Sequence, residues 1–172
     1  PNLYDLKLEL VAADGNVSRE QTIRFGIREY AYDKNDNVFH LRVNGVPCFV
    51  KGGNWGMSEY MLRCRGEEYR TKLKLHREMN FNMIRNWLGS TTDDDFYRYC
   101  DEYGIMVWDD FWLNSTGHLP YDIFAFNENA VEKIKRLRNH PSIAVWCGNN
   151  EGDPEPPLTG WLTEDIKTFD GG

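Results

Sequence analysis

Four predicted strands of this 172-residue sequence each end in a cluster of carboxylate, amide, guanidinium or aromatic side chains. Aromatic planes stack on the C–H faces of a pyranose ring, while polar groups bind its hydroxyls. The composition of the clusters therefore indicates a sugar site. The four clusters are Asn54-Trp55, Arg85-Asn86-Trp87, Asp109-Asp110-Phe111-Trp112 and Asn149-Asn150-Glu151.

Alternating strand and helix patterns predict that these clusters share one edge of a parallel sheet. Strands are expected at 49–55, 82–87, 105–111 and 143–151, with helices at 66–79, 93–103 and about 125–139. Repeated strand-helix units give a parallel sheet with right-handed crossovers, and active-site groups lie at the carboxyl ends of such strands. The pattern fits either an unusual small α/β sheet or the front half of a barrel.

Two β-hairpins are predicted before this sheet. Residues 4–11 and 18–27 alternate polar and apolar side chains around Asp14-Gly15, as the last hairpin of a β-sandwich would. Residues 38–43 and 46–51 flank Asn44-Gly45, a strong hairpin signal. At the other end, residues 153–172 are rich in proline at the start and are expected to be irregular.

Composition excludes several classes of partner. The net charge is −7, and the basic residues cluster only in the short segment 133–138, so no nucleic acid is expected. No stretch approaches the roughly 18 apolar residues that span a bilayer, so no membrane is expected. The four cysteines form no CxxC pair, and we expect neither a metal nor another cofactor. The compartment stays open, with a periplasmic or secreted location favoured for a bacterial parent protein.

Several motifs together resemble glycoside hydrolase family two. Within the family, Lys51-Gly52-Gly53-Asn54-Trp55 and Ser58 to Arg63 most resemble the β-mannosidase and exo-β-glucosaminidase branch. The similarity covers residues 24 to about 157. The other motifs are Phe25-Gly26-Ile27-Arg28, Asn80 to Arg85, Cys100 to Trp108 and Arg138-Asn139-His140-Pro141-Ser142 to Glu151.

The resemblance implies a domain organisation. Residues 1–27 would be the C-terminal strands of an immunoglobulin-like β-sandwich, and 28–152 the first four β/α units of a (β/α)8 catalytic barrel, followed by the irregular tail 153–172. In that arrangement we expect an apolar set of strand residues to face the barrel interior. The set is Val50, Ile84, Val107 and Val145.

The resemblance also implies a retaining double displacement, in which two carboxyl groups stand about 5–5.5 Å apart. Glu151 matches the proton donor, while the family's nucleophile is a Glu on a seventh strand that this chain does not contain. The chain alone is therefore expected to be inactive. Asn150 would bind the sugar 2-substituent, and Arg85 would lie beside the nucleophile or form a structural salt bridge. Walls and hydroxyl binders of the subsite would be Asn54, Trp55, Trp87, Asp109, Asp110 and Trp112.

The substrate implied for the parent protein is an oligosaccharide or glycoconjugate with a terminal β-mannosyl or β-glucosaminyl unit. Similar enzymes often carry Gln and Glu at the positions of Asp109 and Asp110, and Asp at that of Glu59, so the sugar stays open. Alternatives are a β-galactosidase or β-glucuronidase specificity and a non-catalytic carbohydrate-binding half-barrel. A further alternative is a structural fragment that self-associates through open strand edges.

Overall fold

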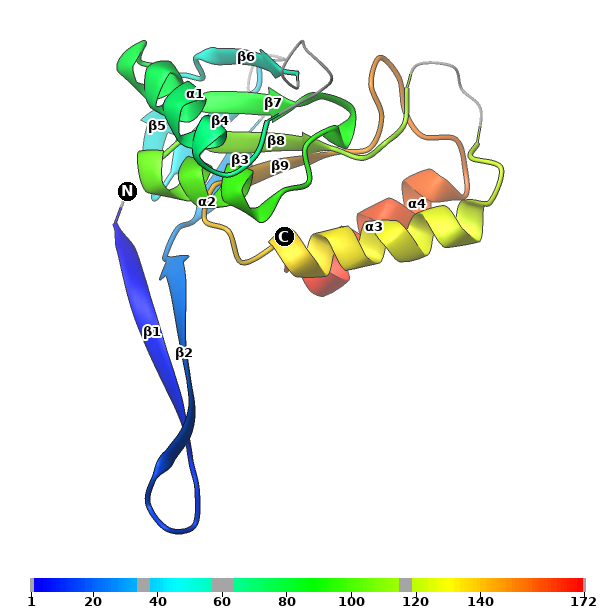
Figure 1. Ribbon diagram of the computed structural model, residues 1–172. Helices are drawn as coiled ribbons and strands as arrows, with labels where there is room; N and C mark the ends of the chain where they lie inside the picture. Colours follow the sequence, from blue (N-terminus) through cyan, green and yellow to red (C-terminus); the bar gives the residue numbers. More distant parts are fainter. Residues whose placement is uncertain (1, 34–37, 57–63, 115–118, 172) are drawn as a thin grey trace.

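The strands form three separate sheets in the computed structural model, which describes residues 2–33, 38–56, 64–114 and 119–171 (Figure 1). The first is the antiparallel pair β1 (Leu3–Val11) and β2 (Val17–Gly26), which extends away from the rest of the chain. Both strands are mostly exposed. The predicted first hairpin is thus confirmed. Its assignment to a sandwich domain stays a prediction.

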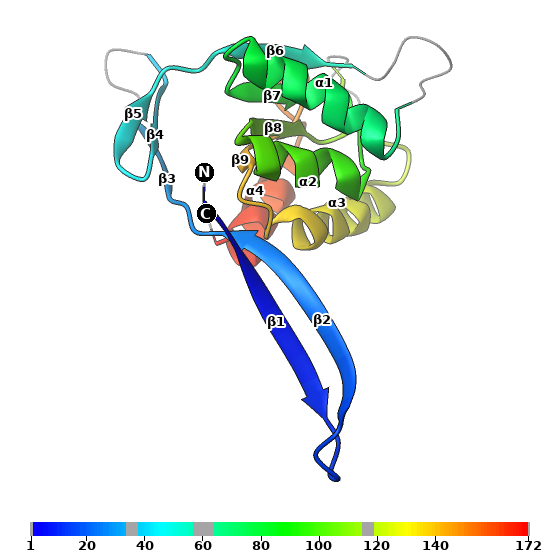
Figure 2. The same cartoon turned by 60° about the vertical axis from the view of Figure 1, so that its left-hand side comes forward.

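The second sheet contains the predicted Asn44-Gly45 hairpin and one strand that the sequence pattern did not reveal. It pairs β3 (Tyr30–Asp33), β4 (His40–Val43) and β5 (Val46–Cys48) in the order β3-β4-β5. Asn44 and Gly45 both adopt positive φ, at 51° and 76°, as a tight hairpin turn requires. This sheet stands apart from α1 and α2 (Figure 2).

The third sheet is parallel and carries the predicted clusters. Its four strands lie in sequence order, so each β/α crossover places the next strand beside the last one. The predicted parallel α/β sheet is confirmed. The strands are β6 (Gly52–Trp55), β7 (Met83–Asn86), β8 (Met106–Asp110) and β9 (Ile143–Cys147).

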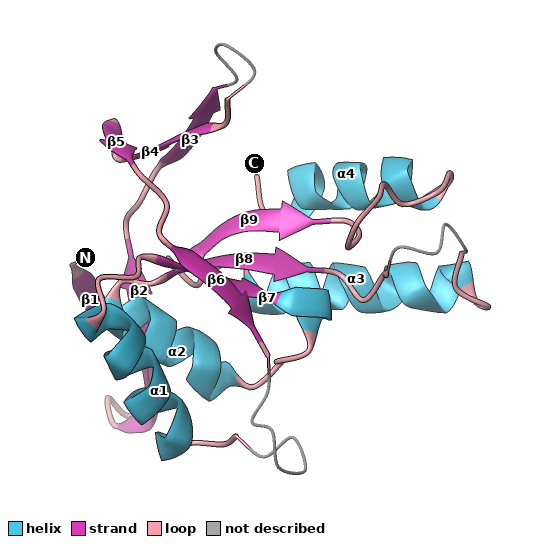
Figure 3. Cartoon of the chain, turned by 90° about the horizontal axis from the view of Figure 1, so that it is seen from above, coloured by secondary structure: helices cyan, strands magenta, loops and turns pink. Residues whose placement is uncertain are grey.

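The first two helices of the chain lie together on one side of this sheet (Figure 3). The helices α1 (Glu67–Glu78) and α2 (Asp94–Tyr103) enclose a core that includes Ile84 of β7 and Val107 of β8. The helix α3 (Ile123–Leu137) begins where the Asp122 carboxylate accepts hydrogen bonds from the N–H groups of Phe124 and Ala125. The described residues contain no helix long and apolar enough to cross a membrane.

The interpretation of residues 153–172 as irregular is wrong, because α4 (Leu158–Phe169) occupies most of this segment. Pro157 lies at the N-cap, where a missing N–H costs the helix no hydrogen bond. Leu158 and Leu162 are buried, and Leu162 packs with Ile134 of α3. The prolines at the start of this segment therefore do not prevent a helix from forming after them.

The predicted inward-facing set is only partly right. Ile84 and Val107 are buried, but against the helices. On the opposite face, Met83 and Met106 pack with Leu41 of β4, and Val145 joins this cluster as predicted. Val50 precedes β6 and is exposed. Because both faces of a parallel sheet are buried, an apolar run does not reveal which side chains face the helices.

Candidate active site

The polar side chains at the ends of β7 and β8 meet as a charged pair. Arg85 donates from Nε to both Asp110 carboxylate oxygens, at 3.0 and 3.1 Å, and from Nη2 to Oδ2 at 2.7 Å. The Asp110 carboxylate also accepts the backbone N–H of Leu88 at 3.1 Å. The side chain of Asp110 is fully buried, whereas that of Arg85 keeps 25% of its exposure. The pair therefore presents an immobilised guanidinium to solvent at the strand ends.

Asn150 connects this pair to the segment after β9. Its Oδ1 accepts from Arg85 Nη2 at 2.9 Å and from Trp87 Nε1 at 3.1 Å. Its Nδ2 donates to Asn114 Oδ1 at 2.8 Å, and its backbone N–H donates to Leu113 O at 3.0 Å. The three side-chain bonds fix the orientation of the amide and the backbone bond fixes the chain beneath it, so Asn150 is a rigid group rather than a mobile loop side chain.

Glu151 follows directly, exposed and with φ at +56°, a left-handed conformation unusual for a residue with a side chain. Backbone strain of this kind is found often at functional sites. Hydrogen bonding to Asp110 is the main cause that raises the pKa of Arg85. The negative charge of Glu151 raises that pKa further. The exposed carboxyl group of Glu151 thus belongs to the residue directly after the fixed amide of Asn150, and its charge acts on the fixed guanidinium of Arg85.

Asp109, predicted as a hydroxyl binder, faces the helices instead. It is fully buried and accepts hydrogen bonds from Tyr97 Oη at 2.7 Å, Lys133 Nζ at 2.8 Å and Asn86 Nδ2 at 3.0 Å. Burial raises the pKa of Asp109, and the ammonium of Lys133 opposes that effect. Neighbouring residues of a strand point to opposite faces, so Asp109 and Asp110 have different surroundings.

The aromatic residues predicted as walls of the subsite also fall into a buried and an exposed group. Trp55 is 5% exposed and packs among the core aromatics, 5.2 Å from Phe96 between ring centroids, with its Nε1 bonded to Thr91. It belongs to the core beneath the strand ends. Trp87 and Trp112 are 38% and 37% exposed and present ring surface. Asn54 is exposed at the end of β6.

Two residues of this region were not singled out from the sequence, Asn114 and Lys133. The signal for Lys133 was present, because Ala130, Ile134 and Leu137 mark the buried side of α3 and position 133 lies among them. Asn114 gave no such signal. Ser58 to Arg63, Glu59 among them, lie outside the described residues.

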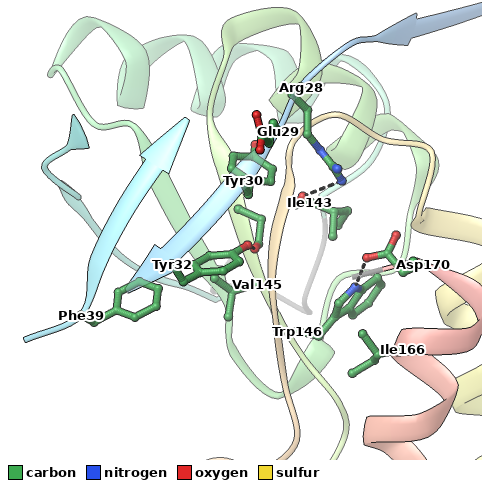
Figure 4. Close-up of a pocket in the computed structure, with 12 residues that line it drawn as sticks. Arg28, Glu29, Tyr30, Tyr32, Phe39, Ile143, Val145, Trp146, Ile166 and Asp170 are labelled. Carbon is green, nitrogen blue, oxygen red and sulfur yellow. Dashed lines mark hydrogen bonds between the residues drawn. The ribbon is translucent and has the colours of Figure 1, made fainter. Parts of the chain in front are cut away.

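A separate hollow of about 500 Å³ runs along the free edge of β9 (Figure 4). Arg28 donates to the carbonyl of Ile143 at 3.2 Å, and Tyr32 donates to that of Ala144. Trp146 and Asp170 form the opposite wall, joined by a hydrogen bond of 2.9 Å. None of the candidate site residues lines this hollow. Within the described part of the chain no group of His, Cys, Asp or Glu side chains is arranged to hold a metal ion.

Known proteins similar to this chain are glycosidases. A mannosylglycoprotein endo-β-mannosidase of Lilium longiflorum is 36% identical over 96% of the chain, which covers 19% of that protein. β-Mannosidase B of Aspergillus clavatus is also 36% identical over 96% of the chain and 20% of its own length. The chain thus spans about a fifth of these relatives. No family model matches it.

Solved structures agree in fold. A β-D-mannosidase of Dictyoglomus thermophilum superimposes with a TM-score of 0.74 at 34% identity, over 99% of this chain and 23% of that one. An exo-chitosanase of Amycolatopsis orientalis superimposes with a TM-score of 0.77 at 21% identity, over 98% of this chain and 21% of that one. With sequence and fold in agreement over nearly all its residues, the chain belongs to glycoside hydrolase family two, among the relatives of the β-mannosidases.

Proposed function

We propose that the protein to which these residues belong is a retaining exo-glycosidase that releases a terminal β-mannosyl or β-glucosaminyl unit. One observation carries the proposal: Asn150 and Glu151 follow β9 with the amide fixed against the Arg85–Asp110 pair. An exposed carboxyl group beside rigid hydrogen-bonding partners suits a proton donor to the glycosidic oxygen. The mannosidases named above support the mannosyl alternative, because they share 34–36% identity with the chain.

The other side chains of the site have roles that follow from their positions. Asn150 offers its amide to the sugar 2-substituent, and the guanidinium of Arg85 would keep a nucleophilic carboxylate ionised. Trp87 and Trp112 offer ring faces for a pyranose. In a complete enzyme the nucleophile would come from a strand beyond these residues, about 5–5.5 Å from the carboxyl group of Glu151.

The proposal includes the architecture around this site. Residues 28–152 would form the first four β/α units of a (β/α)8 barrel, with 1–27 closing a β-sandwich domain. The sheet order β6-β7-β8-β9, with polar clusters at the carboxyl ends, supports this arrangement. A structure of the full-length protein with eight strands in one closed sheet would establish it, and an open sheet would refute it.

The test of the function is Glu151→Ala in the full-length protein. We expect hydrolysis of substrates with poor leaving groups to fall by about 10²–10⁴, with a much smaller loss for activated aryl glycosides. Azide should rescue the aryl substrates by attacking the glycosyl-enzyme. Glu155→Ala, an exposed carboxylate a short distance along the chain, is the control and should change neither rate.

Equal losses on both substrate types without azide rescue would assign the proton donor elsewhere. A full-length protein that binds but never hydrolyses p-nitrophenyl β-mannoside or β-glucosaminide would favour the non-catalytic binding module. The 172-residue chain by itself should show no turnover, because a retaining mechanism needs both carboxyl groups. Turnover by the purified chain that survives Glu151→Gln would contradict this reasoning.

A further inference from the structure

Lys133 of α3 is a buried cation directly beneath the candidate site. Only 5% of its side chain is exposed, and its ammonium donates to Asp109 Oδ1 at 2.8 Å and to the backbone carbonyl of Asp110 at 2.6 Å. The ammonium also lies 5.0 Å from the ring centroid of Trp112 and 5.5 Å from that of Phe111. Lys133 therefore contacts the end of β8 at several successive residues.

The turn after β7 closes over the same ammonium. Gly89 has φ at +57°, and a Cβ built there would lie 2.5 Å from Asp110 O and 2.8 Å from Lys133 Nζ. Only a glycine allows the turn to come this close. The ammonium thus lies between the Gly89 turn, the Asp110 carbonyl and the Trp112 ring.

Burying an ammonium group is unfavourable, and a well-packed apolar side chain of similar volume is often at least as stable. Stability alone therefore gives a weak reason for a lysine at position 133. The contacts give a stronger one. Lys133 holds the backbone carbonyl of Asp110, while Arg85 and the Leu88 N–H hold its carboxylate. Asp110 is fixed at both ends.

From Asp110 a chain of hydrogen bonds reaches Asn150, the residue before the proposed proton donor Glu151. Arg85 bonds to Asp110 at 2.7 Å and to Asn150 at 2.9 Å, and Asn150 precedes Glu151 in sequence. A shift of the β8 end would displace Arg85 and Asn150 together. Displacements of about 1 Å remote from the chemistry can cost about a hundredfold in rate.

We propose that Lys133 is a positioning residue that sets the end of β8, and through Asp110 the Arg85–Asn150 chain beside Glu151. In the same arrangement Asp109 serves as the counter-charge of Lys133 rather than as a sugar ligand. The carboxylate at position 109 then reflects the buried lysine and not the identity of the sugar. The inference rests on the proposed function of the site.

The test compares Lys133→Met, Asp109→Asn and the double variant in the full-length protein. Lys133→Met leaves Asp109 buried without its cation, so both melting temperature and activity should fall. The double variant removes both charges, so its melting temperature should recover while kcat stays about 10- to 100-fold low. KM should change little, because the lost interactions act mainly in the transition state. Sugar preference should be unchanged in Asp109→Asn, because this variant keeps the Lys133 bond to the Asp110 carbonyl and Asp109 is not a sugar ligand in this arrangement.

Lys135→Met is the matched control, since Lys135 lies on the same helix but is exposed. It should leave kcat and KM at their wild-type values. If the double variant does not fold, Lys133→Gln with Asp109→Asn replaces it in the assay. This pair keeps a neutral donor to the Asp110 carbonyl, so its kcat should lie between the low value expected for the double variant and the wild-type value. The proposal would be overturned by a wild-type kcat in whichever of these two double variants is stable, or by a changed sugar preference in Asp109→Asn.

Hydrogen exchange supplies a measurement that does not depend on turnover. Amides of residues 107–114 and 148–152 should exchange about tenfold faster in the double variant, and at the wild-type rate in Lys135→Met. Unchanged exchange in the double variant would refute the positioning role. Absence of activity in the wild-type protein would instead refute the proposed function, so the two failures are distinguishable.

Discussion

Replacing Arg85 should destabilise the protein more than replacing Asp110. The two side chains share a forked pair of hydrogen bonds, but only Asp110 is fully buried. In Arg85→Met the Asp110 carboxylate loses its counter-charge and, among the described residues, keeps the N–H of Leu88 as its polar partner. In Asp110→Asn the guanidinium keeps Asn150 as a partner and 25% of its exposure to water.

These surroundings set the expected magnitudes. An uncompensated charge left in the interior costs about 3–5 kcal/mol, so we expect Arg85→Met to lower the free energy of unfolding by that amount. In Asp110→Asn the guanidinium loses hydrogen bonds that water can partly replace. Losing hydrogen bonds to a charged group costs about 1.5–3 kcal/mol, and we expect a loss of unfolding free energy in that range. The double variant should be more stable than Arg85→Met alone, because it contains no uncompensated carboxylate.

Urea unfolding followed by tryptophan fluorescence measures these differences, at one fixed protein concentration. Variants are comparable where the slope of free energy against urea is unchanged. An equal loss of unfolding free energy in Asp110→Asn and Arg85→Met would refute the reasoning. It would show that the burial of Asp110 does not make the loss of its partner more costly. Additive effects in the double variant would show that the two side chains do not interact.

Three further predictions follow from other parts of the structure. Gly89→Ala should cost more than about 2 kcal/mol in unfolding free energy, because its Cβ would lie 2.5 Å from the Asp110 carbonyl; near-wild-type stability would contradict the packing. Burial raises the pKa of Tyr30 to about 12, so the stability it contributes below pH 10 is lost between pH 10 and 12. The stability difference between wild type and Tyr30→Phe should therefore shrink by about 1.4 kcal/mol from pH 8 to pH 11, and a constant difference in urea unfolding would refute this. The 172-residue chain should form dimers or larger species at micromolar concentration, because β6 and β9 are the edges of the parallel sheet; sedimentation as a monomer with protected edge amides would exclude that.

Local signals in the sequence were sufficient for most secondary structure and for the position of the site. Asn44-Gly45 determines a hairpin because both residues tolerate positive φ. Gly104 ends α2 in the left-handed conformation, as its place after the helix predicts. Strand-helix repeats determine a parallel sheet, whose carboxyl ends collect the Arg85, Asp110 and Asn150 side chains. Each of these inferences depends on a few neighbouring residues.

Tertiary structure decided which face each strand residue occupies and which charges are buried. Ile84 and Trp55 pack against the helices, and Asp109 pairs with Lys133, which is 24 residues away in the sequence. Such choices depend on which surface packs against the sheet, and parallel strands carry apolar residues on both faces. Helix α4 likewise forms because it packs against α3, with Leu162 buried beside Ala130 and Ile134, and this contact outweighs the prolines before the helix. Local sequence patterns do not predict which distant residue a side chain will contact. Only the folded structure therefore shows that Asp110 lies at the site and Asp109 lies beneath it.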